Sequence, residues 1–452
     1  MLKGLFSGAS EGPPNFVIIM ADDLGYGDLG CYGARDIKTP RLDALANEGM
    51  RFTSYYSGAP NCTGSRAALL TGCYPNRIGL SSKNLPPGGY TGLNPDEKNI
   101  ASVLNEAGYS SAFVGKWSLG THPNFMPLSQ GFDYFFGIPF SHSFVDSATE
   151  ENLYLTSNLP LIDNEIEMEE DTDPSALTQL FTEQAAEFIE TVGENPFCLI
   201  MSHHLPHRPI TVPPEFEGIS AYGPYGDAVE ALDWSVGAML DVLKSLNHDK
   251  DTMVIFVSDN GPYTAGQTAL GHRCGNAGEY RGGKNHTTEG GMRVPCIVRW
   301  PKHVPPGKVC EDIVCAMDFL PTFAGLAKVQ LPRTHKIDGK NILPLLEGEL
   351  PKEPIRTEFY YYRESRLQAV RSGEWKMHVF HPEWGIEEPK PEDYKLFNLD
   401  ADPGENTDVS PENPEVVEQL IKVADRARRE LGDSVKKRSG MGVRPIGEVK
   451  AE

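Results

Sequence analysis

The sequence lacks the features that mark membrane, zinc-binding and nucleic-acid-binding proteins. No apolar stretch is long enough to span a bilayer, and residues 1–15 lack the apolar core of a signal peptide. The eight cysteines include no Cys-x-x-Cys pair, so zinc and thioredoxin-type sites are not expected, and no disulfide pairing follows from their spacing. Acidic residues outnumber basic ones, and the formal net charge is −22. Because so acidic a surface repels polyanions, we expect neither nucleic acid nor an anionic membrane as a partner.

What the sequence does contain is a regular alternation of apolar runs and amphipathic segments. Phe16–Met20 is wholly apolar and is followed by Ala21-Asp22-Asp23, which is typical of a buried parallel strand with charge at its carboxyl end. A helix is expected from Thr39 to Gly49. The pattern repeats with helices at Asn99–Ala107, Ser175–Val192 and Asp227–Leu246 and strands at Tyr109–Val114, Phe197–Ser202 and Thr252–Val257. Such units predict an α/β fold whose large, mostly parallel sheet is covered by helices on both faces.

The character of the sequence changes after about residue 348. Short strands that look antiparallel are expected at Thr357–Tyr362, Leu367–Val370 and Trp375–Phe380, and a helix at Glu415–Leu431. We therefore predict a main domain over residues 14–348 and a smaller C-terminal α+β subdomain over 349–452. The polar tail from Gly432 onward is expected to be mobile.

Oxygen-bearing side chains follow two of the predicted strands. Asp22 and Asp23 end the first strand, and Asp259 and Asn260 end the strand at 252–257. The carboxyl ends of parallel strands are where α/β proteins bind ligands. A set of ligands that consists of carboxylates and one neutral amide oxygen favours calcium or magnesium over zinc. The sequence therefore predicts a hard divalent cation at this edge of the sheet.

The segment Pro60–Gly72 combines a cysteine with an arginine one helical turn later. Cys62 precedes a helix that is expected to begin near Ser65, and a helix N-terminus lowers the pKa of a thiol. Arg66 can offer a planar fork of donors to an oxyanion. The plain structural alternative is a small buried residue followed by a surface arginine.

Several motifs occur in a fixed order along the chain. They are Asp22–Asp28, Cys62–Gly72, Gly115–Trp117, Ser258–Gly261 and Gly283–Arg293, extended by Gly137–His142 and Leu396–Glu405. Together they resemble the type I sulfatases of the alkaline phosphatase superfamily, in particular the group of arylsulfatase A and N-acetylgalactosamine-6-sulfatase. The resemblance covers about residues 14–410. It implies an alkaline phosphatase-like fold and the hydrolysis of sulfate esters.

The resemblance also implies a modified nucleophile. A formylglycine-generating enzyme would oxidise Cys62 to formylglycine, whose hydrate carries two hydroxyls on one carbon. One hydroxyl would attack sulfur and expel the alcohol, and the other would drive out sulfate and regenerate the aldehyde. Residue 62 would also contact a calcium ion, with magnesium as the alternative.

Individual roles follow from the same resemblance. The calcium ligands would be Asp22, Asp23, Asp259 and Asn260. Arg66 would orient the nucleophile, Lys116 and Lys284 would hold the sulfate oxygens, and His207 would meet the ester oxygen. These charges suit an anionic ester, because fixed cations stabilise the charge that develops on the leaving oxygen.

Two positions depart from the family pattern. The modification signature normally has proline where this chain has Gly64, which puts conversion of Cys62 in question. Ser118 stands where the family has the histidine that acts as base in the release of sulfate. A serine hydroxyl is not a base at neutral pH, and His122, four residues on, is a candidate substitute.

The substrate is less well defined than the reaction. A sulfated saccharide or an aryl sulfate is expected, and the candidate binding residues are Ser118, His122, Ser141 and Arg208, with His272 and Arg273 as further contacts. A phosphodiesterase or phosphonate monoester hydrolase on the same fold stays open, as does a sulfatase-like protein that binds without turnover. The family suggests a periplasmic, secreted or lysosomal location, and oligomeric state does not follow from the sequence.

Overall fold

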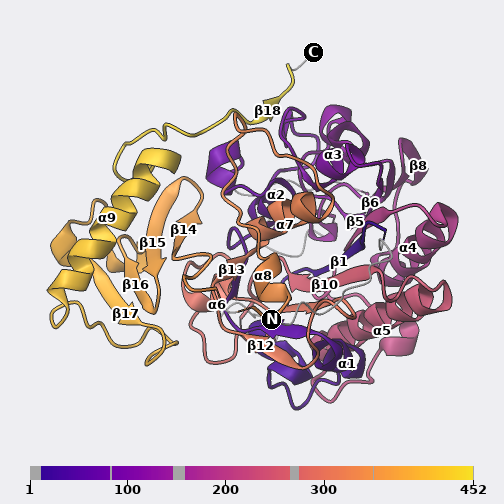
Figure 1. The fold of residues 1–452 in the computed structure, drawn as a ribbon, viewed down its shortest axis with the longest axis horizontal. Helices are drawn as coiled ribbons and strands as arrows, with labels where there is room; N and C mark the ends of the chain where they lie inside the picture. Colours follow the sequence, from indigo (N-terminus) through magenta and orange to yellow (C-terminus); the bar gives the residue numbers. More distant parts are fainter. Residues whose placement is uncertain (1–11, 82–83, 146–157, 265–273, 350, 451–452) are drawn as a thin grey trace, which may run out of the picture.

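The computed structural model describes residues 12–81, 84–145, 158–264, 274–349 and 351–450. Its largest element is a ten-stranded mixed sheet with the strand order β12-β2-β11-β10-β1-β9-β5-β6-β7-β8 (Figure 1). The strands span β1 Asn15–Ala21, β2 Met50–Phe52, β5 Ser110–Lys116, β6 Tyr134–Ile138, β7 Leu161–Asp163, β8 Ile166–Glu169, β9 Phe197–Ser202, β10 Thr252–Ser258, β11 Cys296–Arg299 and β12 Lys308–Cys310. The central strands β10, β1, β9, β5 and β6 run parallel. The predicted α/β sheet is thus confirmed.

Helices cover both faces of this sheet. This is required because successive apolar side chains of β1 point to opposite faces and both sets are buried. Phe16, Ile18 and Met20 point into one core, and Val17 and Ile19 point into the other. The first core packs against α2 Cys62–Thr71, α3 Ile100–Asn105, α7 Phe319–Leu326 and α8 Leu343–Leu346. The second packs against α1 Pro40–Glu48, α4 Leu177–Val192 and α5 Pro224–Ser245, which follow one another from the bottom to the right-hand side of Figure 1.

Several predicted boundaries shift. The α2 helix begins at Cys62 and not near Ser65, and α5 begins at Pro224, three residues before the expected start. A 3-10 turn at 174–176 replaces the expected start of α4, and Asn99 caps α3 without belonging to it. These differences follow from turn and capping geometry, which apolar periodicity does not encode.

A separate antiparallel sheet lies toward the C-terminus, on the left in Figure 1. It contains β14 Glu358–Arg363, β15 Arg366–Ser372, β16 Trp375–His378 and β17 Lys395–Asn398, of which β17 was not predicted as a strand. Helix α9, Pro414–Leu431, packs its apolar face on this sheet. The two sheets meet around α6, Glu289–Met292, and the short pair β3 Tyr55–Tyr56 and β13 Val314–Cys315.

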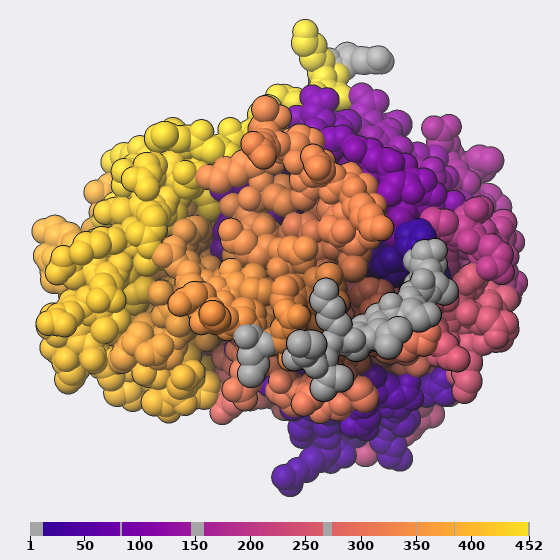
Figure 2. All heavy atoms as spheres, in the orientation of Figure 1, coloured from indigo at the N-terminus to yellow at the C-terminus, as the bar shows by residue number. Residues whose placement is uncertain are grey.

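The expectation of a mobile C-terminal tail is wrong. Strand β18, Gly447–Glu448, pairs with β4, Thr91–Gly92, and the C-terminal segment that carries it lies at the top of the molecule, in yellow, in Figures 1 and 2. The guanidinium of Arg444 donates two hydrogen bonds of 2.7 Å to the carboxylate of Glu97. This bidentate ion pair and the strand pairing hold a polar segment that has no apolar pattern of its own.

No helix among the described stretches of the chain has the length and apolar character needed to cross a membrane.

Candidate active site

The candidate site lies at the carboxyl ends of the central parallel strands. The β1 register pairs Met20 with Ser202 of β9 and Ala21 with Ser258 of β10. The residues that follow these three strands therefore meet at one edge, as the sequence predicted. Lys116, the last residue of β5, reaches the same edge.

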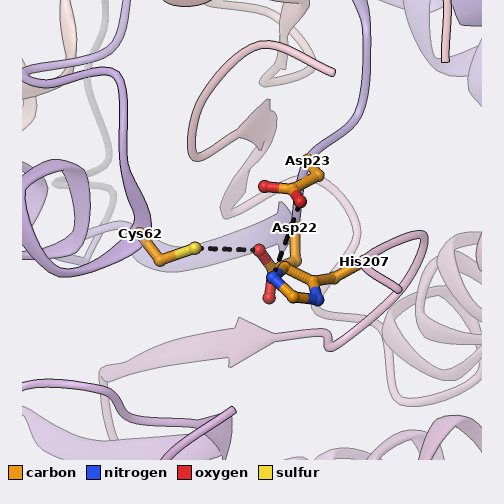
Figure 3. Close-up of side chains that lie close together, drawn as sticks. All are labelled: Asp22, Asp23, Cys62 and His207. Atoms are coloured by element: carbon orange, nitrogen blue, oxygen red, sulfur yellow. Dashed lines mark hydrogen bonds and ion pairs between the residues drawn. The ribbon is translucent and has the colours of Figure 1, made fainter. Parts of the chain in front are cut away.

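Cys62 projects into this edge from the first turn of α2 (Figure 3). Its Sγ donates a hydrogen bond of 3.3 Å to Oδ1 of Asp22, and the ammonium nitrogens of Lys116 and Lys284 lie 3.7 and 3.5 Å from Sγ. The side chain is only 1% exposed. Two ammonium groups that face one buried atom form a site for an oxyanion bound at residue 62.

The expected low pKa of the Cys62 thiol is wrong. Burial raises its pKa well above the ordinary value, and the charge of Asp22 adds to the rise, while Lys116 and Lys284 only partly oppose it. The helix N-terminus does not compensate for the lost solvation. An unmodified Cys62 is therefore held as a neutral thiol, which is a poor nucleophile.

Three carboxylates and one amide surround this thiol. Asn260 donates a hydrogen bond of 2.7 Å from Nδ2 to Asp23, and the backbone N–H of Asp23 donates to Oδ1 of Asp259 at 3.1 Å. Burial and the charge of Asp22 raise the pKa of Asp259 to about 7. Asp22 itself has a pKa well below its usual range, because the attraction of Lys116 and Arg66 outweighs the effect of burial.

The oxygen atoms of this cluster fit a hard divalent cation. Asp22 and Asp23 each offer a carboxylate oxygen, and these oxygens lie within 4.8 Å of each other, of Sγ of Cys62 and of a ring nitrogen of His207. Asn260 adds an amide oxygen that is buried and has no hydrogen-bond partner among the described residues. A buried oxygen without a partner is costly, so it calls for a ligand. The crowding that raises the pKa of Asp259 would also be relieved by a cation.

Arg66 is part of this core and not a surface residue. Its Nη2 lies 3.0 Å from Asp259 and 3.4 Å from Asp22, and its Nη1 donates to the carbonyl oxygen of Lys116 at 2.8 Å. The guanidinium thus connects Asp22 after β1 and Asp259 after β10 with Lys116, the last residue of β5. It holds the charged side chains in place beneath residue 62.

Lys284 approaches the thiol from the loop before α6. Its ammonium lies 2.8 Å from Asp23, and its backbone N–H donates to the carbonyl oxygen of Pro262 at 2.8 Å. Burial opposes its charge, yet the carboxylates of Asp23 and Asp22 raise its pKa above the ordinary value. Lys284 is therefore an ammonium at every working pH.

His207 reaches the cluster from the loop after β9 (Figure 3). Its Nε2 lies 3.6 Å from Asp23, and its Nδ1 lies 2.5 Å from the carbonyl oxygen of Arg208. A carbonyl oxygen only accepts, so Nδ1 carries a hydrogen. Burial, followed by the charge of Lys284, holds the pKa of His207 well below its usual range. The ring is therefore neutral, with the lone pair of Nε2 turned toward the cluster.

Two further histidines pack behind His207 and were not predicted as site residues. The ring of His142 lies 5.6 Å from that of His207 and 5.1 Å from that of His204, centre to centre. His142 Nε2 contacts the carbonyl oxygen of Pro209 at 2.9 Å, which anchors the loop that carries His207. The Gly137–His142 motif contained the signal, but its histidine had no assigned role.

Ser118 and His122 occupy different surroundings. Ser118 is buried with a φ of 59°, and its carbonyl oxygen accepts a 3.0 Å hydrogen bond from Thr63, the residue after Cys62. His122 instead caps a 3-10 turn by accepting from the backbone N–H of Asn124 at 3.3 Å. Among the contacts of the described residues, none connects His122 with the cluster.

The remaining substrate-binding candidates are spread around the cluster. Ser141 is buried and lies 3.0 Å from Ser143, hydroxyl to hydroxyl. Arg208 stacks on the ring of Tyr263, 3.6 Å from its centre, and Tyr263 had not been singled out. His272 and Arg273 fall outside the described residues.

Known proteins match nearly the whole chain in sequence. A family model described as Sulfatase matches residues 14–329, and one described as N-sulphoglucosamine sulphohydrolase, C-terminal, matches residues 278–430. N-acetylgalactosamine-6-sulfatase of Mus musculus is 38% identical over 83% of this chain and 74% of that protein. Arylsulfatase A of Bos taurus is 38% identical over 91% of this chain and 88% of that protein.

A solved structure agrees with the sequence relatives. The crystal structure of Ps i-CgsB in complex with k-i-k-neocarrahexaose superposes with a TM-score of 0.78. The two chains are 32% identical, and the match covers 92% of each. The mixed sheet and the small C-terminal sheet are therefore those of a known architecture.

Proposed function

Because the chain belongs to the sulfatase family and is a sulfuric ester hydrolase, we propose that it cleaves a sulfated saccharide with a formylglycine made from Cys62 and one bound calcium ion. The observation that carries this proposal is the pair of ammonium groups, Lys116 and Lys284, that face Sγ of Cys62 at 3.7 and 3.5 Å. A buried site with this charge suits a sulfate group bound at residue 62.

The raised pKa of Cys62 supports the modification. A buried neutral thiol attacks sulfur poorly, so the residue needs another form to serve as nucleophile. The hydrate of formylglycine supplies a hydroxyl for this attack. Its maturation would require a formylglycine-generating enzyme, which acts on an extended chain and so before this segment is buried in α2.

Four residues would hold the cation. Asp22, Asp23 and Asp259 supply carboxylate oxygens, and Asn260 supplies the amide oxygen that has no hydrogen-bond partner among the described residues. When bound there, calcium supplies positive charge that polarises the sulfate and favours the ionised form of a bound hydroxyl. Magnesium is the alternative that the same oxygen ligands permit.

The cationic side chains stabilise the reacting ester. Lys116 and Lys284 bind the sulfate oxygens and hold sulfur over residue 62. Arg66 binds Asp22 and Asp259 and thereby fixes the carboxylates that orient the nucleophile. Since these groups are placed before substrate arrives, they stabilise developing charge without reorganisation.

His207 would protonate the departing alcohol oxygen. Its Nδ1 hydrogen is committed to the carbonyl oxygen of Arg208, so donation must come from Nε2. That requires the ring to be cationic, although burial favours the neutral form in the free enzyme. A bound anionic ester beside Nε2 favours the cationic ring, so proton donation would depend on the presence of substrate.

The substrate class comes from the relatives. One relative is named for N-acetylgalactosamine 6-sulfate, and one related structure holds a neocarrahexaose. A saccharide is therefore the class of leaving alcohol that we propose for this chain.

The modified residue can be tested directly by mass spectrometry. Trypsin releases residues 52–66 as one peptide, because Arg51 and Arg66 flank it with no lysine or arginine between them. After expression with a formylglycine-generating enzyme, we expect this peptide to carry the mass of an aldehyde at residue 62 and to react with a hydrazide. A preparation that hydrolyses sulfate esters while its peptide carries only the unmodified thiol would overturn the proposal.

A further inference from the structure

A short segment connects Lys284 in the candidate site with the small C-terminal sheet. The segment runs from Lys284 to Glu289, the first residue of α6. On the side of the candidate site, the backbone N–H of Asn285 donates to the carbonyl oxygen of Pro60 at 2.8 Å. Pro60 lies two residues before Cys62, so the segment contacts the stretch of chain that carries the proposed nucleophile.

Side chains from the small sheet hold the same segment from the other side. Lys376 of β16 donates from its ammonium to the carbonyl oxygen of Thr287 at 2.8 Å. Gln368 of β15 accepts a hydrogen bond of 2.6 Å from the hydroxyl of Thr287. Glu405, in the loop after β17, accepts from the backbone N–H of Glu289 at 2.7 Å. Three side chains from outside the main sheet therefore fix the backbone of this segment.

Lys376 lies at the centre of these contacts. Its side chain is fully buried, and its ammonium lies 3.0 Å from Glu289 and 2.9 Å from Glu405. Burial opposes the charge of Glu289, yet the charge of Lys376, followed by that of Arg293, lowers the pKa of Glu289 to about 2. Because a buried charge without a partner is costly, both carboxylates depend on this ammonium for their positions.

The ammonium of Lys284 needs such support from its backbone. A lysine has a flexible stem, so the place of its ammonium depends on where the backbone lies and on the contacts of the side chain. This ammonium lies 2.8 Å from Asp23 and 3.5 Å from Sγ of Cys62. A displacement of about 1 Å near a reacting centre can lower a rate a hundredfold. Movement of the segment would therefore weaken the contact of Lys284 with a bound sulfate.

We propose that Lys376, on the small C-terminal sheet, is a positioning residue that holds the sulfate-binding Lys284 in place through the segment 284–289. The inference rests on the proposed function, in which Lys284 binds a sulfate oxygen. Lys376 binds the segment and Glu405, so its effect on sulfate passes through Lys284. The small sheet then contributes to the active site as well as to the fold.

The test compares the wild type with Lys376→Met in the hydrolysis of a chromogenic aryl sulfate. Rates are divided by the amount of aldehyde found at residue 62, and inhibition by inorganic sulfate is measured in the same assay. For Lys376→Met we expect kcat/KM to fall by about tenfold to a hundredfold, with a higher KM. The Ki for sulfate should rise, because a displaced Lys284 binds sulfate oxygens less well. A loss of folded protein alone would lower the apparent kcat and leave KM and Ki unchanged.

A double-mutant cycle shows whether the effect passes through Lys284. In a Lys284→Ala background, Lys376→Met should change kcat/KM by less than about twofold, because the group that it positions is absent. If the two losses multiply, Lys376 acts by another route and the inference is wrong. Arg428→Met is the matched control, because it breaks a buried ion pair of 3.0 Å with Asp433 on the helix that packs on the same sheet. This control should leave KM and the Ki for sulfate unchanged.

Two neutral variants decide the question if Lys376→Met does not fold. Thr287→Val and Gln368→Leu each remove the hydrogen bond between the segment and β15 without leaving a buried charge unpaired. Each should raise KM and the Ki for sulfate by about twofold to fivefold, as expected for one lost hydrogen bond. Unchanged KM and Ki in both variants would show that the small sheet does not position Lys284.

The outcomes distinguish this inference from the proposed function. If the wild type is active and Lys284→Ala lowers kcat/KM, but Lys376→Met leaves KM and the Ki for sulfate unchanged, the inference is wrong and the proposed function stands. If converted wild type hydrolyses neither the aryl sulfate nor N-acetylgalactosamine 6-sulfate, the proposed function itself is wrong.

Discussion

A Cβ atom on Gly64 would lie 2.6 Å from the Cβ of Ala59 and 2.8 Å from Oδ1 of Asn61. The Ala59 contact cannot be relieved by turning a side chain. The glycine at the place of the family's proline is thus required by the packing of this chain around α2. Its presence does not by itself indicate a lost modification signal.

This contact predicts the effect of restoring the family residue. Gly64→Pro and Gly64→Ala should each lower the free energy of unfolding by about 1–3 kcal/mol, as overpacking does. Adding Ala59→Gly should recover part of the loss, because it removes the atom in closest contact. Urea denaturation of the single and double variants measures the effect, and equal losses in single and double variants would exclude the contact as the cause.

Lys284 should contribute to the transition state and not only to the fold. Lys284→Ala removes an ammonium 3.5 Å from Sγ of Cys62 and should reduce kcat/KM for an aryl sulfate by a factor corresponding to about 2–4 kcal/mol. Arg281→Ala, three residues earlier and exposed, serves as the matched control with no expected loss. An unchanged kcat/KM in a folded Lys284→Ala enzyme would rule the role out.

Ser118 should make sulfate release the slow step of turnover. Without a base at this position, converted enzyme should show a burst of alcohol followed by slow turnover in stopped-flow experiments with a chromogenic aryl sulfate. Ser118→His should raise kcat, and histidine tolerates the positive φ of 59° better than most residues.

His122 provides the counter-test. Its ring accepts from the backbone N–H of Asn124, and the described contacts do not connect it with the cluster. His122→Ala should therefore leave kcat unchanged. If this variant loses turnover while Ser118→His gains nothing, His122 supplies the base and the account of Ser118 is wrong.

Asp28 should make stability depend on pH. This carboxylate accepts hydrogen bonds from Gly25, Tyr225 and Asn276, and burial raises its pKa from 3.8 to about 7. Between these values the folded state keeps a proton that the unfolded state has lost. Asp28 therefore contributes to the free energy of unfolding at low pH. This contribution declines by about 1.4 kcal/mol per pH unit as the pH rises toward 7.

The variant Asp28→Asn isolates the contribution of Asp28 to the pH dependence of the free energy of unfolding. The variant does not titrate at this position, so the wild-type advantage in free energy of unfolding should shrink between about pH 4 and pH 7. Urea denaturation at several pH values measures the difference. A difference that stays constant over this range would show that Asp28 is ionised throughout.

Much of the site could be predicted because an apolar run followed by polar residues marks the end of a buried strand in the sequence. The β9 boundaries, Phe197–Ser202, agree with the prediction, and the convergence of Asp22 with Asp259 follows from the parallel order of their strands. The local sequence pattern is sufficient to predict these residues, because charged side chains directly after a buried apolar strand are typical of a ligand-binding site in an α/β protein. The division into domains at residue 348 stays a prediction.

What could not be predicted depends on distant partners. The Cys62 thiol was expected to have a low pKa from its helix position, but its burial is set by residues far along the chain, such as Lys284. The docking of the tail depends on Arg444 meeting Glu97, which no local pattern encodes. His142 and Tyr263 likewise acquire their places only through packing of loops from different strands.

The most direct test of the account is the release of inorganic sulfate by the wild type and by Cys62→Ala, both expressed with a formylglycine-generating enzyme. The substrates are a chromogenic aryl sulfate and N-acetylgalactosamine 6-sulfate, with calcium present. We predict sulfate release by the wild type, in proportion to the fraction of residue 62 found as aldehyde, and none above background by Cys62→Ala. Equal release by both proteins, or a fully converted wild type that releases no sulfate, would contradict it.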